Sequence, residues 1–372
     1  MFDARPTAEN YVRTPVSRCG TGRRGFVLAL GGMAAVAGAR AATPAAVIRA
    51  AAAPAEPFPD RVSILVAGPR GGRMDRWADA IEAAFSRALP PETTLRQTLS
   101  GGADGVTAAN QFEARVAPDG QTVLLLPGEA PLAWLTGDPR ARFDVANWLP
   151  VMAGLTCGVL VSRVPASALG RGTRLRVATS APAGPELAAL LGLYLMGIEP
   201  VPAYGLHDTA RALQALRGGA VDAVFLVGPD VPSLLANAAA AGAMPLFTLG
   251  APTPSGLQCD PLLPEVPTAQ ELMTELGGTP PTGPLTEAWR SAAVATQIEF
   301  AVVLPPLTPA GLVAQWRRAG TEASRALQSS APGVRLLDGP EANTTTTAIA
   351  VDSAAMLALR HWLAARFNWT PS

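Results

Sequence analysis

The stretch 65-LVAGPRGGRMDRWADAI-81 joins an apolar run to an amphipathic pattern through a turn with two adjacent glycines. Residues 62–66 are expected to form a buried strand. Residues 75–89 are expected to form a helix, because apolar side chains recur there about every 3.6 positions. Glycines let backbone N–H groups face a ligand, and a helix start favours anions. With Arg70 and Arg73 added, the turn predicts a small-anion site. A tight turn with solvated arginines is the alternative.

The same turn does not fit a nucleotide site. Gly68, Gly71 and Gly72 match neither the dinucleotide fingerprint nor the phosphate-loop pattern with its Lys-Ser/Thr ending. The whole chain contains no lysine, so a phosphate-loop lysine and a lysine Schiff base are both excluded. A carboxylate suits these groups better. Asp75 either caps the helix or positions the ligand.

Strand-like and helix-like patterns alternate along the rest of the chain, which predicts an α/β fold with parallel pairing. The length of 372 residues favours two domains, and the zero net charge argues against a nucleic-acid partner. Residues 251–285 are rich in Pro, Gly and Thr and are expected to be irregular. A turn followed by a buried strand is expected in the segment 118–128. Further strands are expected at 152–161, 175–178, 221–227, 245–249 and 299–304, and further helices at 185–196, 233–241, 309–327 and 353–367.

The N-terminal region has the pattern of an export signal. Arg23-Arg24 with Phe26 precede a short apolar core, and small residues lead to Ala42, so residues 1–41 read as a twin-arginine-like signal peptide. Gly22 replaces the usual serine or threonine before the arginine pair. An uncleaved anchor is the alternative. Residues 42–59 read as a flexible leader, and a periplasmic location is expected.

Residues that would carry catalysis or a metal are sparse. His207 and His361 have no partner at metal-ligand spacing, so no metal and no cofactor are expected. Ser180 lacks the G-x-S-x-G context of a nucleophile. Cys157 and Cys259 could pair or stay as buried thiols. These observations favour a binding protein over an enzyme.

Several segments together resemble the Bug-type periplasmic solute receptors of tripartite tricarboxylate transporters. The family's first strand and loop read here as 64-ILVAGPRGGRMD-75, and its glycine turn, helix and Pro-Asp-Gly strand read as 100-SGGADGVTAANQFEARVAPDGQTVLL-125. The later segments 201-VPAYGLHDTARALQALRGGAVDAVF-225, 264-PEVPTAQEL-272 and 304-LPPLTPAGLVAQW-316 follow in the family's order. The resemblance runs from about residue 60 to the end.

The resemblance implies a two-lobed periplasmic binding protein of type II, with mixed, mostly parallel sheets, flanking helices and a ligand cleft between the lobes. One lobe would comprise 60–161 and 298–372, and the other 162–297. The chain would cross between them near Ser162 and near Gln297. A monomer is expected. Residues 277–295 look like an insertion.

The resemblance also places ligand contacts on two glycine loops. Gly71, Gly72 and Asp75 would come from the first, and Thr179, Ser180 and Gly184 from the second. The second loop, 179-TSAPAGPEL-187, keeps one glycine and gains prolines, and the Tyr-Lys-Gly segment is rearranged around Tyr204. Arg70 and Arg73 are added from charge alone.

The leading hypothesis is a receptor that binds a small carboxylate and delivers it to a membrane permease without performing a reaction. A sensory receptor that contacts a membrane kinase is one alternative. The others are a secreted enzyme that uses Ser180 or Asp222, and a degenerate receptor whose cleft is filled by Pro182, Pro185 or Tyr204.

Overall fold

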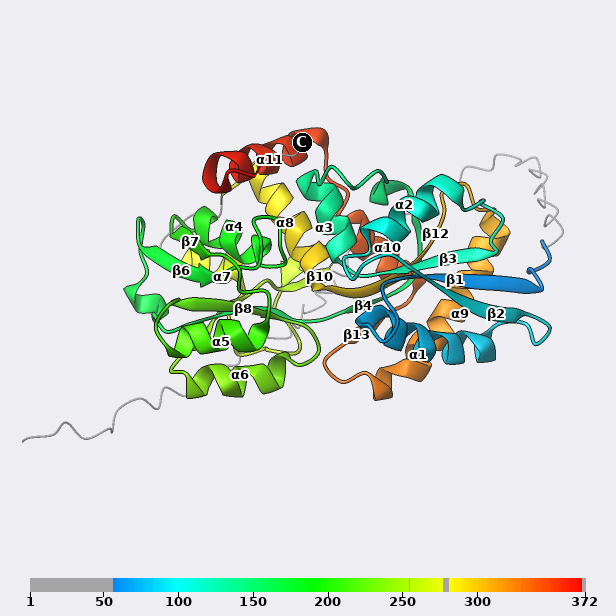
Figure 1. The fold of residues 1–372 in the computed structure, drawn as a ribbon, viewed down its shortest axis with the longest axis horizontal. Helices are drawn as coiled ribbons and strands as arrows, with labels where there is room; N and C mark the ends of the chain where they lie inside the picture. Colours follow the sequence, from blue (N-terminus) through cyan, green and yellow to red (C-terminus); the bar gives the residue numbers. More distant parts are fainter. Residues whose placement is uncertain (1–55, 254, 277–280, 370–372) are drawn as a thin grey trace, which may run out of the picture.

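The computed structural model describes residues 56–253, 255–276 and 281–369, and it contains two large sheets side by side (Figure 1). The predicted signal peptide and most of the predicted leader lie outside the described residues. The six-stranded sheet has the order β13 (Arg335–Leu337), β4 (Leu149–Leu155), β12 (Ile298–Leu304), β3 (Thr122–Leu126), β1 (Arg61–Ala67), β2 (Thr94–Ser100). The five-stranded sheet has the order β7 (Glu199–Ala203), β6 (Arg174–Ala178), β8 (Ala223–Val227), β5 (Gly158–Ser162), β9 (Met244–Thr248).

Both sheets are mixed, and the expectation of mostly parallel pairing is wrong. β1 pairs in parallel with β2 and β3, and β6 pairs in parallel with β7 and β8. The remaining pairings, which involve β12, β4, β13, β5 and β9, are antiparallel. The reason lies in the two strands that follow the passages between the sheets. The chain enters the five-stranded sheet on β5 and returns to the six-stranded sheet on β12, and each of these strands is antiparallel to both of its neighbours.

The first passage between the sheets divides the strand that was expected at 152–161. β4 ends at Leu155 in the six-stranded sheet, and β5 begins at Gly158 in the five-stranded sheet. The sequence pattern did not reveal this break, because the residues on both sides of it are apolar and buried. The second passage occurs at Gln297, whose carbonyl accepts a hydrogen bond of 2.9 Å from the Thr156 amide. The two passages therefore lie side by side. The domain limits themselves stay a prediction.

Helices cover both faces of each sheet (Figure 1). They are α1 (Arg73–Ala88), α2 (Val106–Arg115), α3 (Glu129–Thr136), α4 (Leu187–Leu195), α5 (Thr209–Arg217), α6 (Val231–Ala240), α7 (Ala269–Glu275), α8 (Pro284–Gln297), α9 (Ala310–Leu327), α10 (Gly339–Thr347) and α11 (Ser353–Phe367). Among these described helices, none is both long enough and apolar enough to cross a bilayer.

Alternating side chains of the strands divide the interior into three clusters. On β1, Ile64 and Val66 pack with α1 and α9, whereas Leu65 packs on the opposite face. Residues of α5 and α6 pack on one face of the five-stranded sheet in a separate cluster. The third cluster includes residues of α3, α4, α8 and α11 and extends across both sheets. The lobes therefore share a core on this face and have separate cores on the α1 and α5/α6 face.

Helix α8 carries much of the shared core, although most of it lies in the segment 277–295 that was expected to be an insertion. Trp289 is fully buried, and its Nε1 donates a hydrogen bond of 3.0 Å to the Ala188 carbonyl on α4. Gln297, at the end of α8, donates from Nε2 to the Gly250 carbonyl beyond β9, also at 3.0 Å. Both bonds lie on the side of the five-stranded sheet. Helix α8 also packs against α3, which follows β3 of the six-stranded sheet, so α8 contacts both lobes.

The segment 251–285, expected to be irregular, contains regular structure. β10 (Ala251–Thr253) and β11 (Gly256–Gln258) form an antiparallel pair, and α7 follows. Thr268 and Glu271 form a capping box at the start of α7. The high Pro and Gly content marks the turns between these short elements and does not exclude the elements themselves.

Candidate functional site

The turn between β1 and α1 holds its own amide groups in internal hydrogen bonds. Gly71 has φ +74°, which favours glycine, and its N–H donates to Asp75 Oδ2 at 2.6 Å. The Gly72 N–H donates to the Pro69 carbonyl at 3.0 Å. Arg76 completes the turn by donating from Nη1 to the Gly71 carbonyl at 2.9 Å. In this arrangement the Asp75 carboxylate takes the place that an anionic ligand would have at Gly71.

Arg73 lies on the first turn of α1 between two glutamates. Its Nη2 donates to both carboxylate oxygens of Glu129, at 2.8 and 2.7 Å, and its Nη1 lies 3.7 Å from Glu299 Oε2. Burial lowers the pKa of Arg73, but the charges of Glu129 and Glu299 outweigh that effect, so its pKa is raised. Trp77 Nε1 donates to the other oxygen of Glu299 at 2.9 Å. The positive charge of Arg73 is thus paired with the carboxylates of Glu129 and Glu299.

A cavity of about 480 Å³ lies between the two lobes on the α1 and α5/α6 face. Figure 1 shows α1 on the same side of the molecule as α5 and α6. One wall comes from α1 and the start of β12, and the other from the starts of α5 and α6 and the turn before α6. The lining residues are Arg73, Arg76, Trp77, Ala80, Thr209, Val227, Gly228, Pro229, Asp230, Leu234 and Glu299.

The second predicted ligand loop follows β6 and is closed on itself. The Thr179 amide donates to the Ala203 carbonyl, and the Gly184 amide donates to the Ala181 carbonyl, each at 3.0 Å. Ser180 Oγ donates to Glu186 Oε2 at 2.7 Å. A side chain at Gly184 would collide with Ser180 and Glu186, so this glycine makes the close packing possible. The retained glycine therefore serves the loop's own structure.

Two groups in this region have shifted pKa values. Burial raises the pKa of Glu186, and the hydrogen bond from Ser180, backbone amides and the charge of His207 offset only part of the shift. Burial also raises the pKa of Tyr204, although its side chain is half-exposed. Tyr204, Pro182 and Pro185 do not line the cavity, so they do not fill it as a degenerate receptor would require.

The other residues considered for catalysis have structural partners. Asp222 accepts from Arg176 Nε at 2.9 Å and from Nη2 at 2.6 Å, and these hydrogen bonds lower the pKa of its carboxyl. Cys157 is a buried free thiol, so it does not pair with Cys259, and burial beside Asp260 raises its pKa. No group of residues that could hold a metal ion occurs in the described ranges.

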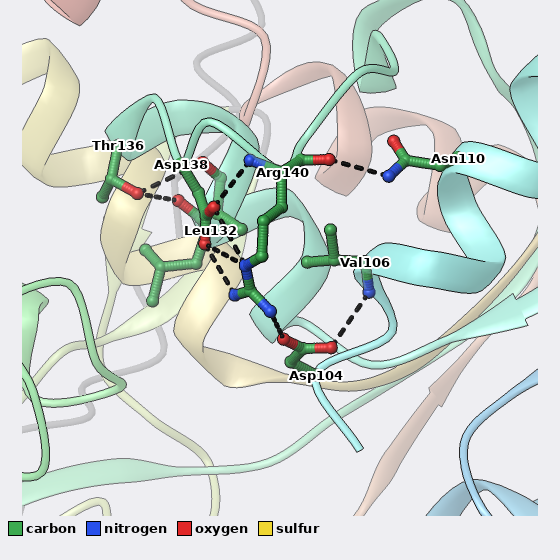
Figure 2. A network of polar contacts seen from close by, with 8 residues as sticks. Asp104, Val106, Asn110, Leu132, Thr136, Asp138 and Arg140 are labelled. Carbon is green, nitrogen blue, oxygen red and sulfur yellow. Dashed lines mark hydrogen bonds and ion pairs between the residues drawn. The ribbon is translucent and has the colours of Figure 1, made fainter. Parts of the chain in front are cut away.

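Figure 2 shows a polar network that fixes the glycine turn after β2. Arg140 donates to Asp138 Oδ2 at 2.7 Å and to Asp104 Oδ2 at 2.8 Å. Asp104 also accepts the Val106 amide at the start of α2, and Asn110 donates to the Arg140 carbonyl at 2.7 Å. The network ties the start of α2 to the turn after α3, and its residues do not line the cavity.

Of the predicted ligand residues, Arg73 alone lines this cavity. Gly71, Gly72 and Asp75 form the turn beside it, and Arg70 is exposed nearby. Arg76 and Glu299 were missed, although the sequence held signals for both. Arg76 lies one helical turn after Arg73 on the same helix face. Glu299 is the lone charged residue in the apolar strand β12.

Comparisons with known proteins give matches among solved structures. No protein-family model matches the chain, and no curated protein matches it significantly. A ligand-free TctC solute binding protein from Polaromonas is 17% identical with a TM-score of 0.58, over 84% of this chain and 99% of that chain. MatC from Rhodopseudomonas palustris with bound malate is 21% identical with a TM-score of 0.48, over 82% and 98%. Periplasmic binding protein BugD is 16% identical with a TM-score of 0.44, over 84% and 98%.

The likeness to the Polaromonas protein extends over nearly all of that chain and concerns the arrangement of its elements. It confirms the α/β fold that the resemblance implied. The described part of the chain therefore has the two-lobed α/β fold of the periplasmic solute-binding proteins.

Proposed function

We propose that the chain is an extracytoplasmic solute receptor of the Bug type, which binds a small carboxylate between its lobes and delivers it to a membrane permease of a tripartite tricarboxylate transporter. Support comes from the fold shared with a solute binding protein and from the order of the sequence motifs. Binding and release require the lobes to close and open, which is the usual gating motion of two-lobed binders.

The observation that carries the proposal is an arginine available in the cavity between the lobes. Arg76 lines the cavity, and among the described residues it forms no ion pair. Its side chain makes one hydrogen bond there, to the Gly71 carbonyl. A guanidinium binds a carboxylate through two parallel N–H···O bonds. Arg73 offers no such bond because Glu129 already holds its Nη2. We therefore assign the ligand carboxylate to Arg76.

The two glycine loops are proposed to complete the ligand site when the lobes close. At the first loop, a ligand carboxylate would displace the Asp75 side chain from the Gly71 amide. At the second loop, Ser180 would have to leave Glu186 before its hydroxyl could reach a ligand. The proposed role of Thr179 and Gly184 is to hold the shape of that loop, because their amides are bonded within the protein.

The test is isothermal titration calorimetry of the mature chain against mono-, di- and tricarboxylates, with and without an added amino group. Binding of at least one ligand is expected, and Arg76→Gln should weaken it about tenfold or more, since a charge-assisted hydrogen bond contributes about 1.5–3 kcal/mol. Arg87→Gln on the same helix is the matched control, because Arg87 is exposed, donates to a main-chain carbonyl as Arg76 does, and does not line the cavity. Absence of binding to the whole panel would refute the receptor proposal.

The proposed location is the periplasm, reached by the twin-arginine route. The support is the Arg23-Arg24 pair ahead of the apolar core, which lies outside the described residues. Replacing both arginines by lysine is expected to leave the chain in the cytoplasm, as measured by cell fractionation. Unchanged export of the double variant would contradict this route.

A further inference from the structure

A second cavity, of about 330 Å³, lies on the opposite side of the molecule from the cavity between the lobes. Figure 1 shows α8 and α11, which border this second cavity, on the side away from α1, α5 and α6. Among the described residues, the two cavities have no lining residue in common. We propose that the second cavity binds a small organic cation with an apolar body and one ammonium group. This site is additional to the proposed receptor function.

The walls of the second cavity come from three segments that are far apart in the sequence. The hairpin of β10 and β11 provides one wall, α8 the second, and the connection between α10 and α11 the third. The hairpin follows β9 of the five-stranded sheet, whereas α10 packs against β4 of the six-stranded sheet. A ligand in this cavity would therefore contact parts of both lobes.

The inner surface of the second cavity is apolar and suits the body of the ligand. Leu257 on β11 and Val294 on α8 are 8% and 2% exposed, and half-buried Val351 adds an apolar surface from the third wall. Small-molecule sites have volumes of about 300–1,000 Å³ and are mostly apolar, with a few polar groups that orient the ligand. The second cavity is at the lower end of this range, so it suits a small ligand.

Three charged side chains line the second cavity at its exposed edge. They are the carboxylates of Glu287 and Asp352 and the guanidinium of Arg290, and all three residues are exposed. Within the part of the chain that the structure describes, none of the three forms an ion pair. Asp352 Oδ1 accepts the Ala355 amide at 2.8 Å, whereas Oδ2 remains open to a ligand. Two carboxylates and one guanidinium give this edge a net charge of −1.

An ammonium group would balance the charge at this edge, whereas a carboxylate would increase the imbalance. Glu287 lies in the first turn of α8, and Asp352 comes directly before α11. The helix dipole favours negative charge at both positions. An ammonium has three N–H donors and no acceptor, so one such group can donate to both carboxylates. A ligand with a single positive charge therefore makes the occupied site neutral.

The experiment compares ligands that share a body and differ in one group. Calorimetry of the mature chain with hexylammonium and hexanol, and with benzylammonium and benzyl alcohol, measures the contribution of the charge. The ammonium member of at least one pair is expected to bind about threefold or more tightly, and added salt should reduce this preference, since ion pairs between exposed groups are weak and screened. Alcohols are used for comparison because a carboxylate could enter the cavity between the lobes.

Variants test whether the ammonium binds at this edge. Glu287→Gln and Asp352→Asn should each weaken ammonium binding about twofold or more, and asparagine keeps the cap of α11. Arg290→Gln should tighten ammonium binding about twofold, because it removes a like charge. A variant that merely disturbs the fold would not tighten binding. Asp230→Asn is the matched control, since Asp230 is an exposed carboxylate that lines the other cavity, and it should leave ammonium binding unchanged.

Three results would overturn the cation site. The alcohols could bind as tightly as the ammonium ions, neither ammonium ion could bind, or Asp230→Asn could weaken ammonium binding as much as Asp352→Asn does. Each of these results leaves the receptor proposal standing, because that proposal concerns a carboxylate in the cavity between the lobes. Absence of carboxylate binding would in turn refute the receptor proposal and leave the cation site standing.

Discussion

Glu186 illustrates how one side chain closes the second loop. Its carboxylate accepts the Ser180 hydroxyl at 2.7 Å, and it lies close enough to Gly184 that a Cβ there would collide with it. Burial nevertheless raises the pKa of Glu186. The loss of hydration therefore destabilises the charged carboxylate more than its hydrogen bonds stabilise it. The loop therefore contains a carboxylate whose charge is unfavourable to the folded protein.

Replacing Glu186 by Gln should consequently stabilise the protein at neutral pH. The native state binds the Glu186 proton more tightly than the unfolded state, where the pKa is near 4.5, so wild-type stability falls as pH rises through the higher native pKa. Gln has no charge to bury and avoids this loss. Thermal unfolding should show a higher Tm for Glu186→Gln at pH 7, with the gain vanishing below pH 4.5. A variant that is less stable at every pH would contradict the burial argument.

The ligand residues were only partly predictable, for a physical reason. Glycines and arginines marked the start of α1, which lies beside the cavity, since that signal is local in sequence. Arg73 was read as a free cation, because nothing local reveals that Glu129 and Glu299 lie against it. These glutamates come from distant segments of the chain, and only the folded sheet brings them to α1.

At the scale of elements, long amphipathic segments were predicted well and short ones were not. The expected helices at 309–327 and 353–367 agree with α9 and α11. In segments of this length many apolar side chains follow the helical period of about 3.6 residues, so the prediction rests on several positions at once. Strand β7 was missed because it contains Pro200 and Pro202. Prolines are tolerated there since β7 is an edge strand of the five-stranded sheet.

The packing of α8 against α4 can be tested through the tryptophan of α8. Trp289→Phe removes the indole N–H that donates to the Ala188 carbonyl, and it also removes part of a fully buried ring. The hydrogen bond and the lost packing together should cost about 1–3 kcal/mol in the free energy of unfolding, measured by urea denaturation.

The matched control for this variant is Trp362→Phe on α11. Trp362 is 6% exposed, and its buried Nε1 has no hydrogen-bond partner within the described residues. The same truncation there removes a similar volume without breaking a hydrogen bond, so it should cost less. Equal losses at the two positions would show that the Trp289–Ala188 hydrogen bond contributes nothing to stability.

At the scale of the molecule, the two faces have different roles. On one face α3, α4, α8 and α11 share a continuous core across both sheets, whereas on the other each lobe has its own core and the cavity lies between them. Closure can therefore occur on the cavity face without separating the shared core. The paired crossings at Thr156 and Gln297 connect the lobes and allow such a motion.

A shared core also means that the lobes should unfold together. Ile81 belongs only to the six-stranded lobe's separate core and Leu226 only to that of the five-stranded lobe, and both are buried. Ile81→Ala and Leu226→Ala should each cost about 2–5 kcal/mol. Each variant should lower the temperature of one common calorimetric transition, with the van't Hoff enthalpy close to the calorimetric enthalpy. Independent lobes would instead give two transitions, each responding to only one of the variants, because destabilisation of one core would not reach the other.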